Sequence, residues 1–147
     1  MIGTRVLMAA TIVTVAAIVL TPVIATCQEK EVSYQKEIRP ILQAHCAVCH
    51  TPEGVGYAVS GFNVQTYTTV MRGTKYGAVV IPGSSGTSNL VWLLEHRADP
   101  AINMPKVCQQ IAREDGKCAL ASQFARQLPS QELILIIEWV NQGAKNN

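Results

Sequence analysis

The hydrophobic pattern of the chain changes near residue 28. Residues 6–25 are almost wholly apolar and carry no charge, whereas beyond residue 32 apolar residues recur within a polar background. There they are often three or four positions apart, which places their side chains on one face of a helix. The sequence therefore predicts a leader segment followed by one domain of several short helices.

The first amphipathic helix is predicted to begin at Tyr34, because the preceding Ser33 is a favourable N-cap residue. Pro40 lies inside the helical pattern, so we expect a kink or two short helices there. His45 is interpreted as a solvent-exposed or helix-end side chain. The apolar face of this helix consists of Ile38, Ile41 and Leu42.

The middle of the chain is expected to hold a loop and two helices. Residues 51–57 are rich in turn-forming residues and are predicted to form the loop. A short helix is expected within residues 63–70, and a buried one after Ser88, which can cap it. In that second helix, Trp92 is interpreted as a core residue and His96 as a surface residue.

The last helix is predicted to start at Ser130, directly after a proline, and to stop at Gly143. Ser130 is the expected cap, and Glu132 lies favourably near the positive end of the helix dipole. Its apolar stripe consists of Leu133, Ile136, Ile137, Trp139 and Val140.

Residues 1–27 resemble an export segment, with Arg5 as the basic residue before the apolar run. Three fates stay open: cleavage after Ala25, retention as a membrane anchor, and lipidation of Cys27 as in bacterial lipoproteins. Each fate places the following domain, residues 28–147, in an oxidising space outside the cytoplasm. We therefore expect a periplasmic protein that is tethered to the cytoplasmic membrane.

The charge pattern excludes one class of partner. The chain has 12 basic and 10 acidic residues, for a formal net charge of +2. The basic residues are scattered and form no run that follows a phosphate backbone. Nucleic acid is therefore not expected as a partner.

The most specific motif is Cys46-Ala47-Val48-Cys49-His50. Two cysteines separated by two residues and followed by histidine have the spacing that attaches a c-type haem. Thiols one helical turn apart reach two vinyl groups on one porphyrin edge and form thioethers. We therefore expect Cys46 and Cys49 to attach one haem c covalently, and His50 to bind its iron.

The same cysteine spacing also occurs in redox dithiols and in zinc sites. A zinc site requires a second ligand pair at similar spacing, and Cys108 and Cys118 lack it and have no nearby histidine. In an oxidising compartment these two cysteines are instead expected to form a disulfide. Closing a loop of this length stabilises a fold by roughly 2–3 kcal/mol.

Met104 is expected to bind the iron on the side opposite the histidine. A thioether is a neutral, soft ligand that stabilises reduced iron and raises the reduction potential. Pro105 stiffens the strap that holds this sulfur. Met71 is the rival, but it lies in a predicted helix, where a methionine ordinarily packs in the core.

A series of residues along the chain has the order and approximate spacing of a known family: 38–42, 46–50, 80–83, Ser88, Leu90, Met104, Pro105 and 139–144. On these residues, the chain from Val32 to Ala144 resembles the small class I-like c-type cytochromes, in particular the planctomycete variety. The resemblance implies an all-α fold in which N- and C-terminal helices cross beside one haem, with His50 and Met104 as axial ligands. The long cysteine-bearing insert, residues 106–127, departs from the family pattern.

Iron with both axial positions filled by protein has no free site for a substrate. We therefore expect an electron carrier rather than an enzyme, with redox proteins as partners and no small-molecule substrate. Two alternatives stay open. The domain is a haem-bearing subunit of a larger periplasmic oxidoreductase, or it is a haem enzyme that binds small ligands if Met104 is labile.

Overall fold

The computed structural model describes residues 30–111 and 118–147. The predicted leader, residues 1–27 with Cys27, lies outside the described residues. Among the residues described, none of the helices has the length and hydropathy that crossing a bilayer requires. The elements are η1 (Tyr34–Ile38), α1 (Arg39–His45), α2 (Val55–Ser60), α3 (Tyr67–Arg72), η2 (Ser85–Thr87), α4 (Asn89–Leu94), β1 (Lys106–Ile111), β2 (Cys118–Ala125) and α5 (Ser130–Asn141).

The predicted N-terminal helix forms as two consecutive short helices. The π-helical η1 begins at Tyr34, and the Ser33 hydroxyl accepts a hydrogen bond from the backbone N–H of Lys36 at 3.3 Å. Pro40 lies in the first turn of α1, where a helix does not require the missing N–H. The expected cap and the expected division at the proline are thus confirmed.

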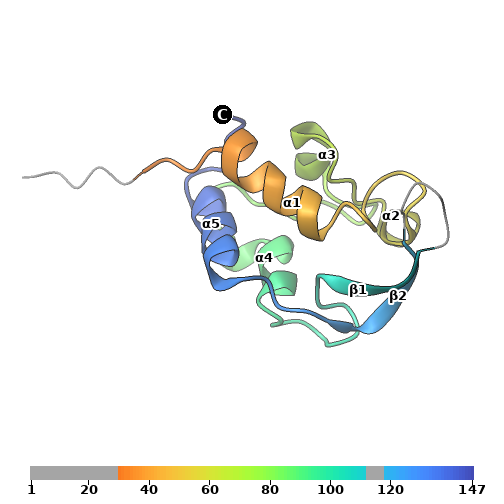
Figure 1. Ribbon diagram of the computed structural model, residues 1–147. Coiled ribbons are helices and arrows are strands. Elements are labelled where there is room, and N and C mark those ends of the chain that lie inside the picture. The colour runs from red at the N-terminus through yellow and green to blue at the C-terminus, as the bar shows by residue number, and fades with distance from the viewer. Residues whose placement is uncertain (1–29, 112–117) are drawn as a thin grey trace, which may run out of the picture.

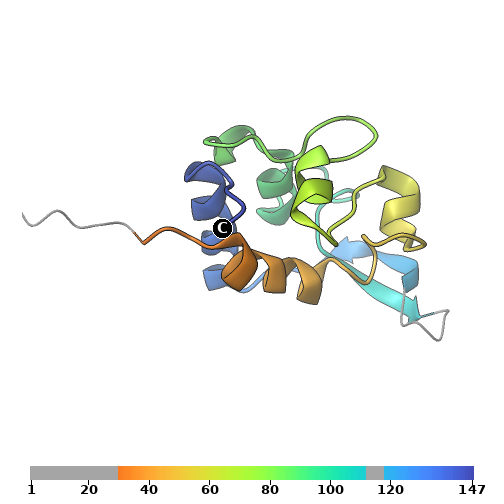
Figure 2. The same cartoon turned by 90° about the horizontal axis from the view of Figure 1, so that it is seen from above.

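The C-terminal helix α5 packs against η1, and the segment after α5 is hydrogen-bonded to the start of the domain. Figures 1 and 2 show α5 beside the η1–α1 pair. The backbone N–H of Val32 donates to the Gln142 side chain at 2.7 Å, and that of Tyr34 donates to the Asn147 side chain at 2.9 Å. These hydrogen bonds join the two ends of the domain, whose residues are more than a hundred positions apart in the sequence.

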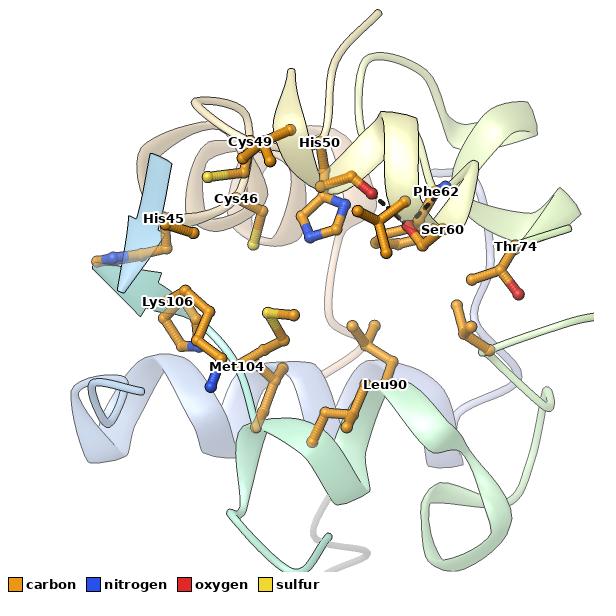
Figure 3. Close-up of a pocket in the computed structure, with 18 residues that line it drawn as sticks. His45, Cys46, Cys49, His50, Ser60, Phe62, Thr74, Leu90, Met104 and Lys106 are labelled. Carbon is orange, nitrogen blue, oxygen red and sulfur yellow. Dashed lines mark hydrogen bonds between the residues drawn. The ribbon is translucent and has the colours of Figure 1, made fainter. Parts of the chain in front are cut away.

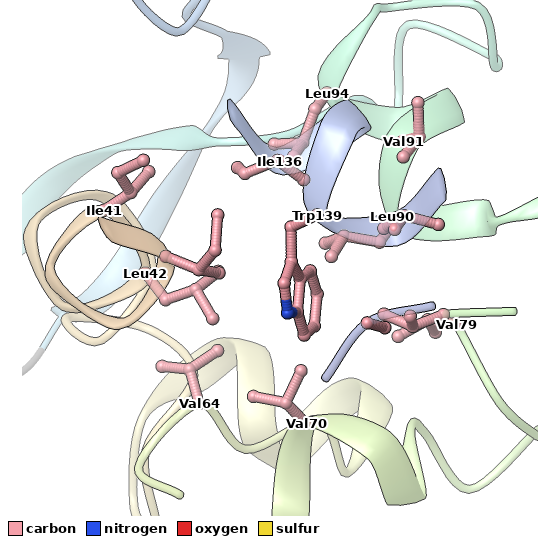
Figure 4. Packing of buried hydrophobic residues seen from close by; sticks show 14 of the residues in the cluster. Ile41, Leu42, Val64, Val70, Val79, Leu90, Val91, Leu94, Ile136 and Trp139 are labelled. Carbon is pink, nitrogen blue, oxygen red and sulfur yellow. The ribbon is translucent and has the colours of Figure 1, made fainter. Parts of the chain in front are cut away.

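The core lies where η1, α1, α4 and α5 meet, and Trp139 is fully buried near its centre (Figure 4). The ring of Tyr34 lies 5.6 Å from that of Trp139 between centroids. The Trp139 indole N–H donates to the Lys145 carbonyl at 2.9 Å, so its polar atom is satisfied. Other fully buried side chains are Ile38, Leu42, Val64, Val70, Val80, Val91, Leu94, Ile136 and Val140.

The expectation of an all-α fold is wrong. The insert forms an antiparallel hairpin of β1 and β2, in which Lys106 pairs with Ala125 and Cys108 with Ala121. The insert includes Val107 and Phe124, residue types that favour strands, and the strand ladder satisfies its backbone groups. The hairpin lies beside α2 (Figure 1).

The predicted Cys108–Cys118 disulfide stays a prediction. The two cysteines lie on the two strands of one hairpin, with Cys118 opposite Ile111 in the backbone register. The side chain of Cys118 lies outside the part of the chain whose side chains are described.

The predicted loop 51–57 is partly wrong, because α2 begins within it at Val55. Gly54 precedes this helix and packs directly on the carbonyl of Cys49, where a Cβ has no room. The Tyr57 N–H donates to the same carbonyl at 3.0 Å. These contacts with the motif, which a sequence pattern does not reveal, help to fix α2.

The helix after Ser88 is confirmed as α4, but two of its side chains have other roles than expected. The Ser88 hydroxyl does not cap α4; it accepts from the Ile81 N–H and donates to the Ser84 carbonyl, each at 2.8 Å. Trp92 is 40% exposed rather than buried in the core. Its indole N–H donates to the Gly86 carbonyl at 2.6 Å.

Candidate haem site

The cysteine motif forms a tight turn at the end of α1. Cys46 is the C-cap residue of α1, and its carbonyl accepts hydrogen bonds from the N–H groups of Cys49 at 3.1 Å and His50 at 2.8 Å. The turn therefore brings two thiols and one imidazole to one wall of a cavity (Figure 3). This is the local geometry that the spacing predicts.

The cavity has a volume of about 240 Å³ and a mainly apolar lining. One water molecule requires only about 10–15 Å³ of such volume, so the cavity is far larger than a single-water site, and its apolar lining favours an apolar ligand over ordered water. Figure 3 shows Cys46 and His50 on one wall and Met104 with Leu90 on the other. The lining also includes His45, Cys49, Val55, Val59, Phe62, Val79, Leu93, Leu94, Pro105 and Lys106.

The two thiols are poorly suited to dithiol redox chemistry. Burial raises the pKa of Cys46 to about 12, and the neighbouring Cys49 contributes to this rise. Burial also raises the pKa of the Cys49 thiol. A reactive redox cysteine requires the opposite, a lowered pKa. Within residues 30–111 and 118–147, no three His, Cys, Asp or Glu side chains are grouped as a metal-ligand set.

The imidazole of His50 is held tightly by its neighbours. Its ring packs edge-on against Phe62, with centroids 5.4 Å apart. A Cβ on Gly56 would lie only 2.7 Å from Cε1 and 2.9 Å from Nε2 of His50. Glycine at position 56 thus allows α2 to approach the ring closely, and this approach fixes the plane of the ring.

Burial lowers the pKa of His50, while the backbone of Phe62 partly opposes this shift. The imidazole is therefore neutral near pH 7, which is the form that binds a metal. Its Nδ1 atom is buried and has no hydrogen-bond partner within the part of the protein described.

Met104 lies on the strap that connects α4 to β1, and it is half-buried. Its backbone N–H donates to the Leu93 carbonyl at 3.1 Å, and its own carbonyl lies 3.1 Å from Nε2 of His96. Met71, the rival, packs against the hydrophobic core and is not part of the cavity lining. The structure therefore brings Met104, not Met71, to the cavity that Cys46 lines.

The sequence interpretation missed the roles of two histidines. His96 is half-buried against the Met104 strap rather than free on the surface. His45 is the last residue of α1, which confirms the helix-end interpretation, but its side chain is largely covered and its Nε2 lies 2.6 Å from the Glu132 carboxylate. Arg126 donates to Nδ1 of His45 at 3.1 Å. Each partner is distant in sequence or lies beyond a turn, so the pattern contained no signal for these contacts.

The residues present fit a covalently attached haem. Two thiols lie on the same wall as a buried neutral imidazole, the remaining lining is largely apolar, and a thioether lies on the opposite wall. This combination matches the chemistry of a haem iron with histidine and methionine ligands. The ligand roles of Cys46, Cys49, His50 and Met104 remain predictions.

Comparison with known families agrees with this geometry. Residues 46–107 match the family model described as Planctomycete cytochrome C. The resemblance seen in the sequence is thereby confirmed. The matched segment extends from the first motif cysteine to the start of β1, so it contains both walls of the cavity. A cytochrome c domain of this family implies covalently bound haem c with its iron.

One curated protein that is similar to this chain is the hydrazine synthase subunit alpha of Kuenenia stuttgartiensis. The two are 27% identical over 134 residues, which cover 80% of this chain but 16% of the relative. The chain therefore matches about a sixth of that subunit. No solved structure matches the chain significantly.

Proposed function

We propose that this cytochrome c domain carries one electron at a time on a single haem c. Cys46 and Cys49 would hold the haem through two thioethers, and His50 and Met104 would be the protein ligands of its iron. The haem supplies the one-electron redox couple. The observation that carries this proposal is that all four side chains line one largely apolar cavity from facing walls.

The protein residues then determine the redox behaviour. The apolar lining excludes water and lowers the local dielectric constant, and both effects help to set the reduction potential of the haem iron. Met104 as a neutral thioether favours the reduced state. Phe62 and Gly56 hold the imidazole plane, so little reorganisation accompanies electron transfer.

We further propose that the domain functions in the periplasm, tethered to the cytoplasmic membrane by residues 1–27, with redox proteins as partners. An oxidising compartment agrees with haem attachment to two cysteines and with the proposed Cys108–Cys118 disulfide. The intact mass of the purified protein tests the fate of residues 1–27 and the attachment of haem, because leader cleavage, lipidation and haem each change the mass by a distinct amount. An intact unmodified leader on a protein recovered from the cytoplasm contradicts the proposal.

Spectroscopy tests the electron-transfer function. The account predicts a low-spin reduced spectrum, a far-red sulfur-to-iron charge-transfer band in the oxidised protein, and slow binding of carbon monoxide. Rapid carbon monoxide binding by the reduced wild-type protein contradicts it. That result indicates a labile Met104 and favours a haem enzyme that binds small ligands.

A second function, as haem-bearing subunit of a larger oxidoreductase, is favoured by one observation. The relative is by name a subunit, and the matched region is a small part of it. Such a role changes the partner but not the haem ligands. Co-purification of a stable stoichiometric partner from mild detergent supports it, whereas a protein that elutes alone and exchanges electrons with soluble carriers supports the independent carrier.

A further inference from the structure

The turn that ends α4 holds the Met104 strap by both backbone polar groups of that methionine. The Met104 N–H donates to the Leu93 carbonyl at 3.1 Å. The Met104 carbonyl lies 3.1 Å from Nε2 of His96. Both contacts come from one turn, so they act together on the orientation of one residue.

The His96 contact has a defined direction. A carbonyl oxygen only accepts hydrogen bonds, so Nε2 of His96 must carry the proton and donate it. His96 has a left-handed backbone conformation, with φ of 56°, which non-glycine residues rarely adopt. The His96 N–H also donates to the Leu93 carbonyl at 3.3 Å. This backbone turn directs the imidazole toward the strap.

The side chain of methionine has three rotatable bonds and adapts easily to its surroundings. The place of its sulfur therefore depends strongly on how well the backbone of the same residue is fixed. In the described structure, Asn103 and Pro105 beside Met104 are buried, and the Pro105 carbonyl accepts from the Arg126 N–H at 2.8 Å. At Met104 itself, the strap is held by the α4 turn.

We propose that His96 is a positioning residue for the methionine ligand. Its Nε2–H fixes the peptide plane of Met104 and thereby keeps the sulfur directed into the cavity. The inference depends on the proposed function, since it presupposes that Met104 binds the iron. It assigns to His96 no contact with the haem.

Two substitutions of His96 distinguish a hydrogen-bond donor to the Met104 carbonyl from a residue that serves only the backbone turn. His96→Asn keeps a residue that tolerates the left-handed conformation, but its amide nitrogen matches Nδ1 and does not reach the strap. His96→Gln places its amide nitrogen near the position of Nε2 and retains a donor. Arg97→Ala is the matched control, because Arg97 lies in the same turn and its guanidinium contacts Glu95 and the Trp92 ring, not Met104.

The readouts are the far-red sulfur-to-iron band of the oxidised holoprotein and the rate of carbon monoxide binding to the reduced holoprotein. Loss of one net hydrogen bond changes an equilibrium about fivefold. We expect about fivefold faster carbon monoxide binding and a weaker band in His96→Asn. We expect values near wild type in His96→Gln and unchanged values in Arg97→Ala.

Two results overturn the inference. The first is a His96→Asn protein with the band and binding rate of the wild type, and the second is a His96→Gln protein that is as impaired as His96→Asn. If His96→Asn does not yield holoprotein, His96→Gly takes its place, because glycine accepts the same φ without strain. Met104→Ala separates the two proposals: an unchanged band in that variant contradicts the proposed ligand itself, whereas loss of the band there and its persistence in His96→Asn contradict only the role of His96.

Discussion

The His50 wall and the Met104 wall face each other across one cavity, but they are supported over very different sequence distances. Thiols and imidazole of the first wall come from one five-residue turn at the end of α1. The second wall depends on a strap that is fixed by the end of α4 and continues into a hairpin. The first is thus a local structure, whereas the second depends on tertiary contacts.

This difference suggests a division of labour. If the proposed function is right, the local wall would attach the haem through Cys46 and Cys49 and supply His50 as one ligand. The tertiary wall would then determine whether Met104 stays bound as the proposed second ligand, and with it the reduction potential and the access of small ligands.

Removal of the local wall is expected to abolish the holoprotein. Replacing Cys46 and Cys49 together by serine removes both thioether sulfurs, so we expect no covalent haem. Mass spectrometry of the denatured protein checks this, with Cys108→Ser as the control that keeps haem attachment. A haem increment that persists in the double variant contradicts the assignment of the motif.

Removal of the sulfur on the tertiary wall is expected to leave a folded holoprotein with altered iron. In Met104→Ala the haem stays attached, the far-red band disappears, the potential falls and carbon monoxide binds readily. Visible spectra and redox titration measure these changes. Met71→Leu is the control, because Met71 packs against the core and its replacement is expected to keep the wild-type spectrum. If the band is lost in Met71→Leu and kept in Met104→Ala, Met71 is the ligand and Met104 is not.

Crowding the local wall is expected to destabilise the fold. In Gly56→Ala the added Cβ comes within 2.7 Å of the His50 ring, so ring or helix must shift. We expect a loss of about 1–3 kcal/mol in the free energy of unfolding. Gly86→Ala is the matched control, because a Cβ there meets nothing within 4 Å. Denaturant titration measures the free energy of unfolding of both variants. Equal values for Gly56→Ala and Gly86→Ala would show that α2 does not pack tightly against His50.

The smallest effect is expected at the contact that links the two walls. Arg126, after β2, donates to His45 at the end of α1 across 3.1 Å. Because Arg126 is exposed, its removal in Arg126→Ala is expected to cost about 0.5–1 kcal/mol of unfolding free energy and to leave the far-red band unchanged. Lys36→Ala, at an exposed position on η1, serves as the control. A large change of the band instead shows that this link orients the methionine wall.

The local wall could be predicted from sequence because its chemistry depends on spacing alone. Cys46, Cys49 and His50 come together through one turn, and the helices at both ends of the domain follow from apolar periodicity and from Ser33 and Pro40. The chemistry of Met104 and the adjacent proline predict it as a ligand; the structure places it in the cavity lining, and its ligand role stays a prediction.

The support of the second wall could not be predicted in the same way. His96 contacts Met104 because the chain reverses direction after α4. His45 contacts Arg126 because the hairpin brings the end of β2 close to the end of α1. The hairpin itself was missed, since the insert was interpreted by its polarity and cysteines and not by strand propensity. The helix α2 was missed because glycines that look like loop residues serve close packing against the motif.

In the proposed ligation, His50 and Met104 are the two protein ligands of an iron held in this cavity. X-ray absorption at the iron edge of the oxidised holoprotein tests it most directly, because sulfur and nitrogen scatterers are distinguished in the first coordination shell. The account predicts one sulfur ligand in the wild type that is absent in Met104→Ala. A wild-type shell with nitrogen and oxygen ligands alone contradicts it.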